Sequence, residues 1–325
     1  MSVLVTGCAG FIGSHLVERL LEEMPDEEVV GVDEFNNFYD PRIKQANISA
    51  AESHPRFHLI HGDLSQPDFV ELLFNSYDFE VVVHLAARAG VRSSIAEPML
   101  YQIANNQATS NLLEVSRRHE ISRFVFGSSS SVYGRSKHVP FREDDPCLEP
   151  ISPYAASKRA NELLCYTYHH LYDLSIACLR FFTVYGPRQR PDMAIHKFTK
   201  MIHRDKPITV YGDGSSARDY TYVDDILDGV VAAMKTEVGF EIFNLGNNQT
   251  VRLLDLIAKI GDALGKEPKI EFGPEQPGDV PITYADISKA QRMLWYKPKT
   301  VIDEGIVRFV EWYRPLASQL EALTS

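Results

Sequence analysis

The sequence is poor in cysteine, and its cysteines are not spaced for a redox or metal motif. Four occur among 325 residues, none of them in a C-x-x-C pair: Cys8, Cys147, Cys165 and Cys178. A disulfide scaffold in a chain of this length would need more of them. We therefore predict a reducing setting, the cytoplasm, and no metal site.

Excess positive charge and long hydrophobic segments are also missing. The net charge is -11 at pH 7, which argues against nucleic acid or an anionic membrane as a partner. A small anionic ligand stays compatible, because it needs only local positive charge. No apolar run approaches the ~18 residues of a membrane helix, and an apolar strand at 3–5 leaves no room before it for a signal peptide.

The first half of the chain alternates strand and helix patterns. Strands are predicted at 2–6, 29–32, 57–60, 81–85, 123–126 and 175–182, with helices near 11–24, 98–119 and 154–172. This alternation is typical of an α/β fold with a Rossmann-type doubly wound parallel sheet. Residues 34–56 are predicted to form a long polar loop.

The composition changes after Thr183, where a proline- and arginine-rich segment begins. Beyond it we predict helices near 194–204, 287–294 and 301–317, a strand near 208–211, a helix then a strand over 252–272, and a turn at 276–280. A strand at 241–245 is expected to return to the main sheet. The expected division is a Rossmann domain at 1–182, to which about 222–250 return, and a smaller α/β region at 183–325.

A glycine-rich turn joins the first strand to the first helix. It reads Gly7-x-x-Gly10-x-x-Gly13, which lets the backbone approach a pyrophosphate whose charge the helix N-terminus favours. Asp33 ends the next strand, about 20 residues further on. A carboxylate there binds the adenosine ribose hydroxyls and repels a 2′-phosphate, so we predict NAD rather than NADP.

Further candidates lie at the ends of later strands. Asp63 follows the third strand, where it is expected to accept a hydrogen bond from the adenine amino group, to cap the next helix, or both. Small residues after the fourth strand, at 86–87, suit close passage of a cofactor. Four serines, 128–131, end the fifth strand and indicate either a polar turn or a hydroxyl-lined pocket; the pocket is favoured, because open α/β sheets bind ligands at that edge.

A tyrosine and a lysine, Tyr154 and Lys158, stand one helical turn apart. Ser152-Pro153 is typical of a helix start, so the two side chains are expected to face the same way. An ammonium near a phenol lowers the phenol pKa from about 10 and makes it a proton acceptor. A Tyr-Lys pair at this spacing is more often a packed aromatic ring beside a solvated amine. The surrounding motifs favour a catalytic role for this pair.

Together these motifs resemble the extended short-chain dehydrogenase/reductases, from Val3 to about Ala290. The resemblance rests on the glycine turn, on Ser129 four residues before Tyr133-Gly134, on Tyr154-x-x-x-Lys158, and on the segment 218–225. It looks closest to the nucleotide-sugar 4-epimerases. Three segments, 36–41, 89–92 and 181–193, are similar to those of UDP-glucuronate 4-epimerases.

The resemblance implies a mechanism. Tyr154, as phenolate, would take the proton of the sugar 4-hydroxyl, Lys158 would support it and bind the nicotinamide ribose, and Ser129 would hydrogen-bond the 4-oxygen. The C4 hydride would pass to tightly bound NAD, the 4-keto sugar would rotate, and the hydride would return to its other face. Family spacing alone selects Ser129. Related dehydratases and decarboxylases carry an acid next to the catalytic hydroxyl, whereas Ser130-Ser131 here favour epimerisation.

The resemblance also assigns binding residues. A 4-keto uronate is a β-keto acid, and our hypothesis is that the planar fork of Arg190 and the Thr183 hydroxyl hold its carboxylate; a solvated or phosphate-binding Arg190 is the alternative. Arg218 is expected at the UDP phosphates, Asp279 at the UDP ribose, and Arg88 at the pyrophosphate or sugar. The cofactor is expected to contact Gly7, Gly10, Phe11, Ile12, Gly13, Asp33, Asp63, Leu64, Leu85, Ala86, Ala87, Arg88, Tyr154 and Lys158.

The sequence therefore predicts an NAD-dependent isomerase that converts UDP-glucuronate to UDP-galacturonate. Residues 1–182 would bind NAD, 183–325 mainly the UDP-sugar, and the family implies a homodimer through helices at about 98–118 and 154–172. UDP-glucose 4-epimerase is one alternative, and a non-catalytic NAD-binding sensor or scaffold is another. Gln276 replaces a family arginine and Arg188-Gln189 a Trp-Gly pair, so the substrate is less firmly indicated than the reaction.

Overall fold

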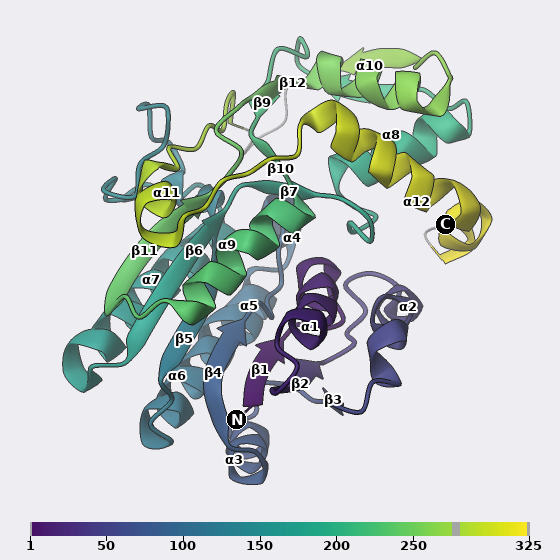
Figure 1. Cartoon of the computed structure of the whole chain (residues 1–325). Helices are drawn as coiled ribbons and strands as arrows, with labels where there is room; N and C mark the ends of the chain where they lie inside the picture. The colour runs from purple at the N-terminus through teal and green to yellow at the C-terminus, as the bar shows by residue number, and fades with distance from the viewer. Residues whose placement is uncertain (1, 275–279, 324–325) are drawn as a thin grey trace.

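A seven-stranded parallel sheet runs through the centre of the molecule (Figure 1). The computed structural model describes residues 2–274 and 280–323. From edge to edge the strands are β11 (Phe240–Leu245), β6 (Ser175–Phe181), β5 (Arg123–Ser129), β4 (Phe79–His84), β1 (Ser2–Thr6), β2 (Glu28–Asp33) and β3 (Phe57–His61). Strands β2 and β3 are added on one side of β1, and β4, β5, β6 and β11 are added on its other side, so the order of the strands reverses between β1 and β4. This confirms the predicted doubly wound fold.

Helices cover both faces of this sheet. One face carries α1 (Phe11–Glu23), α2 (Pro41–Glu52) and α9 (Val223–Lys235); the other carries α3 (Pro67–Ser76), α6 (Ala108–Arg118) and α7 (Pro153–Tyr172). A separate buried cluster lies on each face. This explains why central strands such as β4 read as continuous apolar runs rather than alternating patterns.

A smaller region lies over the carboxyl ends of the strands (Figure 1). Its helices are α8 (Ala194–His203), α10 (Leu253–Leu264) and α12 (Ile302–Leu323), while α11 (Ser288–Leu294) packs beside β11. Its short strands form the pairs β7 (Thr183–Tyr185) with β10 (Tyr220–Tyr222), β8 (Ile208–Tyr211) with β13 (Ile270–Gly273), and β9 (Ala217–Arg218) with β12 (Val251–Arg252).

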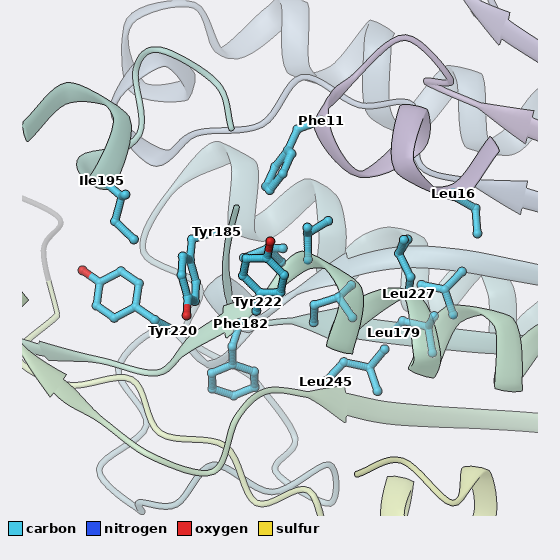
Figure 2. Close-up of a cluster of buried hydrophobic side chains, with 14 of the residues drawn as sticks. Phe11, Leu16, Leu179, Phe182, Tyr185, Ile195, Tyr220, Tyr222, Leu227 and Leu245 are labelled. Carbon is cyan, nitrogen blue, oxygen red and sulfur yellow. The ribbon is translucent and has the colours of Figure 1, made fainter. Parts of the chain in front are cut away.

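One core joins the two regions. Figure 2 shows Phe11 of α1 near Tyr222 and Tyr185, with Ile195 of α8 beyond them. The rings of Tyr185 and Tyr222 pack edge to face, with their centres 5.5 Å apart. As predicted, β11 returns to the main sheet, where it pairs with β6. Among the described residues, no helix combines the length and apolar character needed to cross a membrane.

The prediction of a loop at 34–56 is wrong, because α2 lies within it. Asp40 caps this helix by accepting a hydrogen bond from the Arg42 amide at 2.9 Å, and Pro41 occupies the first turn. Ile43 and Ile48 are buried along one face. Of its polar residues, Arg42, Gln45 and Ser49 are exposed, whereas Lys44 and Asn47 are buried.

The single helix predicted at 98–119 is also wrong in detail. It consists of α5 (Pro98–Tyr101), a π-helical turn (Gln102–Gln107) and α6, and a further helix, α4 (Val91–Ala96), precedes it. The wide turn contains Asn105, whose backbone oxygen accepts bonds from Thr109 Oγ1 at 2.6 Å and Asn161 Nδ2 at 3.1 Å. These bonds come from side chains, so the hydrophobic pattern gave no sign of the turn. Gln276 and Asp279 lie outside the described residues.

A buried carboxylate ties β10 to two loops of the smaller region. Asp219 accepts hydrogen bonds from the amides of Asn247 (2.7 Å), Asn248 (3.1 Å) and Ala285 (3.2 Å), and from the Thr221 hydroxyl (3.2 Å). Asp219→Ala should lower the free energy of unfolding, measured by urea titration, by about 3 kcal/mol, because it leaves buried amides unpaired.

The control for this prediction is Asp262→Ala, which removes an exposed carboxylate on α10. It should change the free energy of unfolding by less than about 0.5 kcal/mol. Equal stability of the two variants would contradict the role given to Asp219.

Candidate active site

A cavity of about 590 Å³ opens at the carboxyl ends of the main strands. Every cofactor contact predicted from the sequence lines it, and so do Ser129, Thr183 and Arg190. The wall is assembled from loops after β1, β2, β3, β4, β5 and β6. This is the edge where open α/β sheets bind their ligands.

The glycine turn at one end of the cavity cannot accept side chains. Gly7 has a φ of +69°, and a Cβ on it would lie 2.9 Å from the backbone of Ala86. A Cβ on Gly13 would lie 2.1 Å from the Gly7 oxygen. The turn therefore brings β1 against the loop after β4 and leaves bare backbone at the start of α1. These residues fit a dinucleotide, whose pyrophosphate is favoured at such an N-terminus.

Asp33 stands at the end of β2, as predicted, and is buried. Its Oδ2 accepts from the Ala9 amide at 3.2 Å and its Oδ1 from the Phe35 amide at 2.9 Å. Lys44 of α2, which the sequence analysis missed, places its Nζ 3.6 Å from Asp33 Oδ1. It was missed because α2 was taken for a loop; Asp40-Pro41, a cap followed by a first-turn proline, is the signal that could have found it.

Asp63 lies in the cavity wall, and its hydrogen bonds exclude one of its two predicted roles. Its carboxylate accepts from the Ser65 amide and hydroxyl, both at 2.8 Å. The next helix, α3, begins at Pro67 with Gln66 at its N-cap position. Asp63 therefore forms a local turn and does not cap that helix, while a bond to adenine stays a prediction.

The Tyr154–Lys158 pair sits on the first turns of α7. Ser152 caps this helix by accepting from the Ala155 amide at 3.1 Å, and Pro153 follows it. Lys158 is buried, and its Nζ donates to the Gly127 carbonyl at 2.6 Å. Burial lowers the pKa of Lys158 to about 8, since the charged form loses its hydration.

Tyr154 differs from the prediction. Burial raises its pKa above the ordinary value near 10, while a hydrogen bond to Ser129 and the positive charge of Arg190 act in the opposite direction. The expected lowering by Lys158 is absent among the described groups, because the ammonium is directed to Gly127. The phenol therefore needs a further positive charge nearby to become a base at neutral pH.

The structure separates two of the four serines. The Ser128 hydroxyl donates to Glu162 Oε1 at 2.6 Å and is buried beneath α7. The Ser129 hydroxyl interacts with Tyr154 and lies 3.2 Å from Ser131 Oγ. Among these hydroxyls, that of Ser129 is therefore the one paired with the tyrosine.

Asn105 braces the cofactor loop against α7. Its amide group exchanges hydrogen bonds with Arg88, accepting from the amide at 2.8 Å and donating to the carbonyl at 3.0 Å. It also donates to the Ser157 hydroxyl at 3.0 Å. The π-helical turn thus fixes the loop after β4 relative to the helix that carries Tyr154.

Arg190 lines the other end of the cavity, with Thr183 in the same wall. Its guanidinium bonds both oxygens of Asp192, at 2.9 and 2.8 Å, and lies 5.2 Å from the ring centre of Phe38. Asp192, Phe38 and Tyr39 are lining residues that were not assigned from the sequence. They belong to segments 36–41 and 181–193, which were used to assign the subfamily but not to assign roles.

Arg218 lies beside the main cavity rather than in it. It lines an adjoining cavity of about 160 Å³, which shares Ser130, Ser131 and Thr183 with the larger one. Its Nη1 donates to the Ala217 carbonyl at 3.0 Å. Because the two cavities share these residues, a ligand whose sugar lies near Thr183 could extend from the main cavity to Arg218. Asp279, predicted nearby, lies outside the described residues.

Comparisons with known proteins identify the family to which the chain belongs. A family model described as GDP-mannose 4,6 dehydratase matches residues 4–309. A UDP-glucuronate 4-epimerase of Thermodesulfobacterium geofontis is 43% identical over 310 residues, which cover 95% of this chain and 95% of the relative.

Two solved structures are similar over nearly the whole chain. UDP-glucuronic acid 4-epimerase from Bacillus cereus, in complex with UDP-glucuronic acid and NAD, has a TM-score of 0.91 at 40% identity, covering 97% of this chain and 100% of that one. UDP-glucose 4-epimerase from Thermotoga maritima, with UDP-glucose, has a TM-score of 0.88 at 30% identity, covering 98% and 100%. Motifs, fold and matches agree: the chain belongs to the GDP-mannose 4,6-dehydratase family of extended short-chain dehydrogenase/reductases.

Proposed function

We propose that this chain is an isomerase, an NAD-dependent 4-epimerase that converts UDP-glucuronate to UDP-galacturonate through a 4-keto intermediate. The observation that carries the proposal is one cavity in which the paired hydroxyls of Ser129 and Tyr154 lie between a dinucleotide cradle and the guanidinium of Arg190. A hydroxyl pair beside a hydride carrier suits oxidation at a carbinol carbon, and an arginine suits a carboxylate.

The residues divide the chemistry among them. Tyr154 takes the proton of the sugar 4-hydroxyl and later returns it, and Ser129 hydrogen-bonds the same oxygen. NAD, when bound, supplies the hydride acceptor and the positive charge that the buried phenol needs. Lys158, charged below about pH 8, binds the nicotinamide ribose.

Epimerisation is favoured over dehydration even though the matching family model carries a dehydratase name. The residues after Ser129 are Ser130 and Ser131, and the Ser131 amide donates to Ser129 Oγ at 3.2 Å. Neither serine can act as the carboxylic acid that shuttles a proton during elimination. The intermediate is therefore expected to be reduced again at C4.

The carboxylate of the sugar is assigned to Arg190 and Thr183. Asp192 takes one edge of the guanidinium, which holds its plane in place, and a guanidinium has further donors for a second carboxylate. A fixed carboxylate cannot turn perpendicular to the 4-ketone, so the intermediate keeps its CO2. Arg218 is assigned to the UDP phosphates, with the cofactor held mainly by residues 1–182 and the UDP-sugar mainly by 183–325.

The cytoplasm is the proposed compartment, because all four cysteines are buried and unpaired as thiols. A homodimer is proposed because α5, the π-helical turn and α7 pack together and expose large apolar side chains. These side chains are Met99 (68% exposed), Ile103 (45%), Leu163 (53%) and Tyr166 (52%). A second copy of the same surface would cover them.

The function is tested by incubating purified protein with UDP-glucuronate and, separately, with UDP-glucose, and following the anomeric protons by NMR. The expected result is a UDP-galacturonate signal with UDP-glucuronate alone. Conversion of UDP-glucose at an equal rate would assign the chain to the neutral-sugar epimerases. Bound NAD with neither product would favour the non-catalytic alternative.

Arg190→Ala should lower kcat/KM on UDP-glucuronate by about 100-fold, because the carboxylate loses a charged bidentate partner. On any residual UDP-glucose turnover the loss should be much smaller, because only the effect of the Arg190 charge on the pKa of Tyr154 is then removed. The matched control is Arg188→Ala in the same segment, since Arg188 pairs with Glu18 of α1 at 2.8 Å. Equal losses on both sugars would contradict the assignment of Arg190.

Changing Met99 and Leu163 together to glutamate should convert the dimer to a monomer, because the charges would be buried on association. The molar mass is measured by light scattering after size-exclusion chromatography. Trp295→Glu serves as the control, since Trp295 is 87% exposed on a different surface. A wild-type monomer would rule out the dimer, and an unchanged mass in the double variant would place its interface elsewhere.

A further inference from the structure

Helix α7 contacts two consecutive residues of β5, just before the catalytic serine. The Nζ of Lys158 donates to the Gly127 carbonyl at 2.6 Å, and the Ser128 hydroxyl donates to Glu162 Oε1 at 2.6 Å. Lys158 and Glu162 are one turn apart, so they face the strand from the same side of the helix. The next residue along β5 is Ser129. The two bonds therefore set where Ser129 lies relative to α7.

Glu162 is itself held by the sheet. Arg180 of β6 donates to both its oxygens, Nε to Oε1 at 2.8 Å and Nη2 to Oε2 at 2.9 Å, and the two side chains are 0% and 1% exposed. The Arg180 guanidinium lies 4.8 Å from the ring centre of Tyr133, whose hydroxyl donates to Asn244 of β11 at 2.6 Å. The carboxylate is thus fixed relative to β5, β6 and β11 together.

A buried ion pair of this kind rarely adds net stability, because desolvation offsets the attraction. What it does supply is geometry. We propose that Glu162 is a positioning residue for epimerisation, which acts through Ser128 to fix Ser129 relative to Tyr154 and which supports the ammonium of Lys158. The inference rests on the proposed epimerase reaction.

The support for Lys158 is electrostatic. Burial lowers its pKa to about 8, and the groups on α7 and β6 that oppose this are Cys165, Glu162 and Cys178. From β4, His84 faces the same ammonium, but burial lowers the pKa of His84 to about 3, so it is neutral. Loss of the Glu162 charge should therefore lower the Lys158 pKa further.

Ser128→Ala tests the positional part, because it removes the bond to β5 and leaves the Glu162 charge in place. We expect kcat on UDP-glucuronate to fall about tenfold, with KM within twofold, since about 1.4 kcal/mol of transition-state stabilisation is a factor of ten. The pH above which kcat falls, on the alkaline side of its pH profile, should be the same as in the wild type. A kcat within twofold of wild type would overturn this part of the proposal.

Glu162→Gln tests the charge, because glutamine keeps the shape and can still accept from Ser128. We expect the decrease of kcat on the alkaline side of its pH profile to begin about one pH unit lower than in the wild type. Unpaired Arg180 can prevent folding of this variant, so Glu162→Gln/Arg180→Gln, which removes both charges, is made beside it. The control is Arg159→Gln, which removes the more exposed partner of Glu162, at 3.1 Å, and should leave kcat unchanged.

A binding measurement separates this proposal from the proposed function. Calorimetric titration of NAD into protein stripped of its cofactor should show affinity falling above about pH 8 in the wild type, and from lower pH in the double variant. This arm needs no turnover, so it stands even if neither UDP-sugar reacts. If the variants and the wild type show the same pH dependence of kcat and of NAD affinity, and differ only in melting temperature, Glu162 is purely structural and the proposal is overturned.

Discussion

The ammonium of Lys158, buried against the end of β5, is the interaction on which the site depends. It bonds the Gly127 carbonyl and lies 4.8 Å from the ring centre of Phe126. A buried charge needs close, fixed acceptors, so α7 must pack tightly on β5. Glycine at this point of β5 also leaves room for the loop after β4, because a Cβ at Gly127 would lie 3.1 Å from the Leu85 side chain. Ser129 and Tyr154 meet because helix and strand approach this closely.

Local charge, rather than the net charge of -11, decides what the cavity can bind. Positive side chains are spread along it, and three of them have a specific partner: Lys44 with Asp33, Lys158 with Gly127, and Arg190 with Asp192. The pairs keep the cations in place and limit the cost of burying them. An acidic protein can therefore present a series of cations to an anionic dinucleotide and an anionic sugar nucleotide.

The backbone does not select the substrate. The uronate and glucose epimerases match this chain with TM-scores of 0.91 and 0.88, so the difference has to lie in side chains. The residues proposed to hold the sugar carboxylate, Thr183 and Arg190, lie in segment 181–193, which is in contact with segment 36–41. Phe38, from the loop after β2, reaches Arg190, from the loop after β7. Sequence similarity identified these loops, but their contacts were visible only in the assembled molecule.

The sequence by itself determined the features that arise within a few residues: the glycine turn between β1 and α1, Asp33 at the end of β2, and the start of α7 at Pro153. Strand, turn and helix order depends on local geometry, and so does the spacing of Tyr154 and Lys158. Tertiary structure decided which serine meets Tyr154, where the Lys158 ammonium points, that Asp192 and Lys44 line the cavity, and that Glu162 accepts a hydrogen bond from Ser128. These outcomes depend on burial and on contacts between distant segments, such as residues 127 and 158. They follow from how the elements pack, which no local pattern encodes.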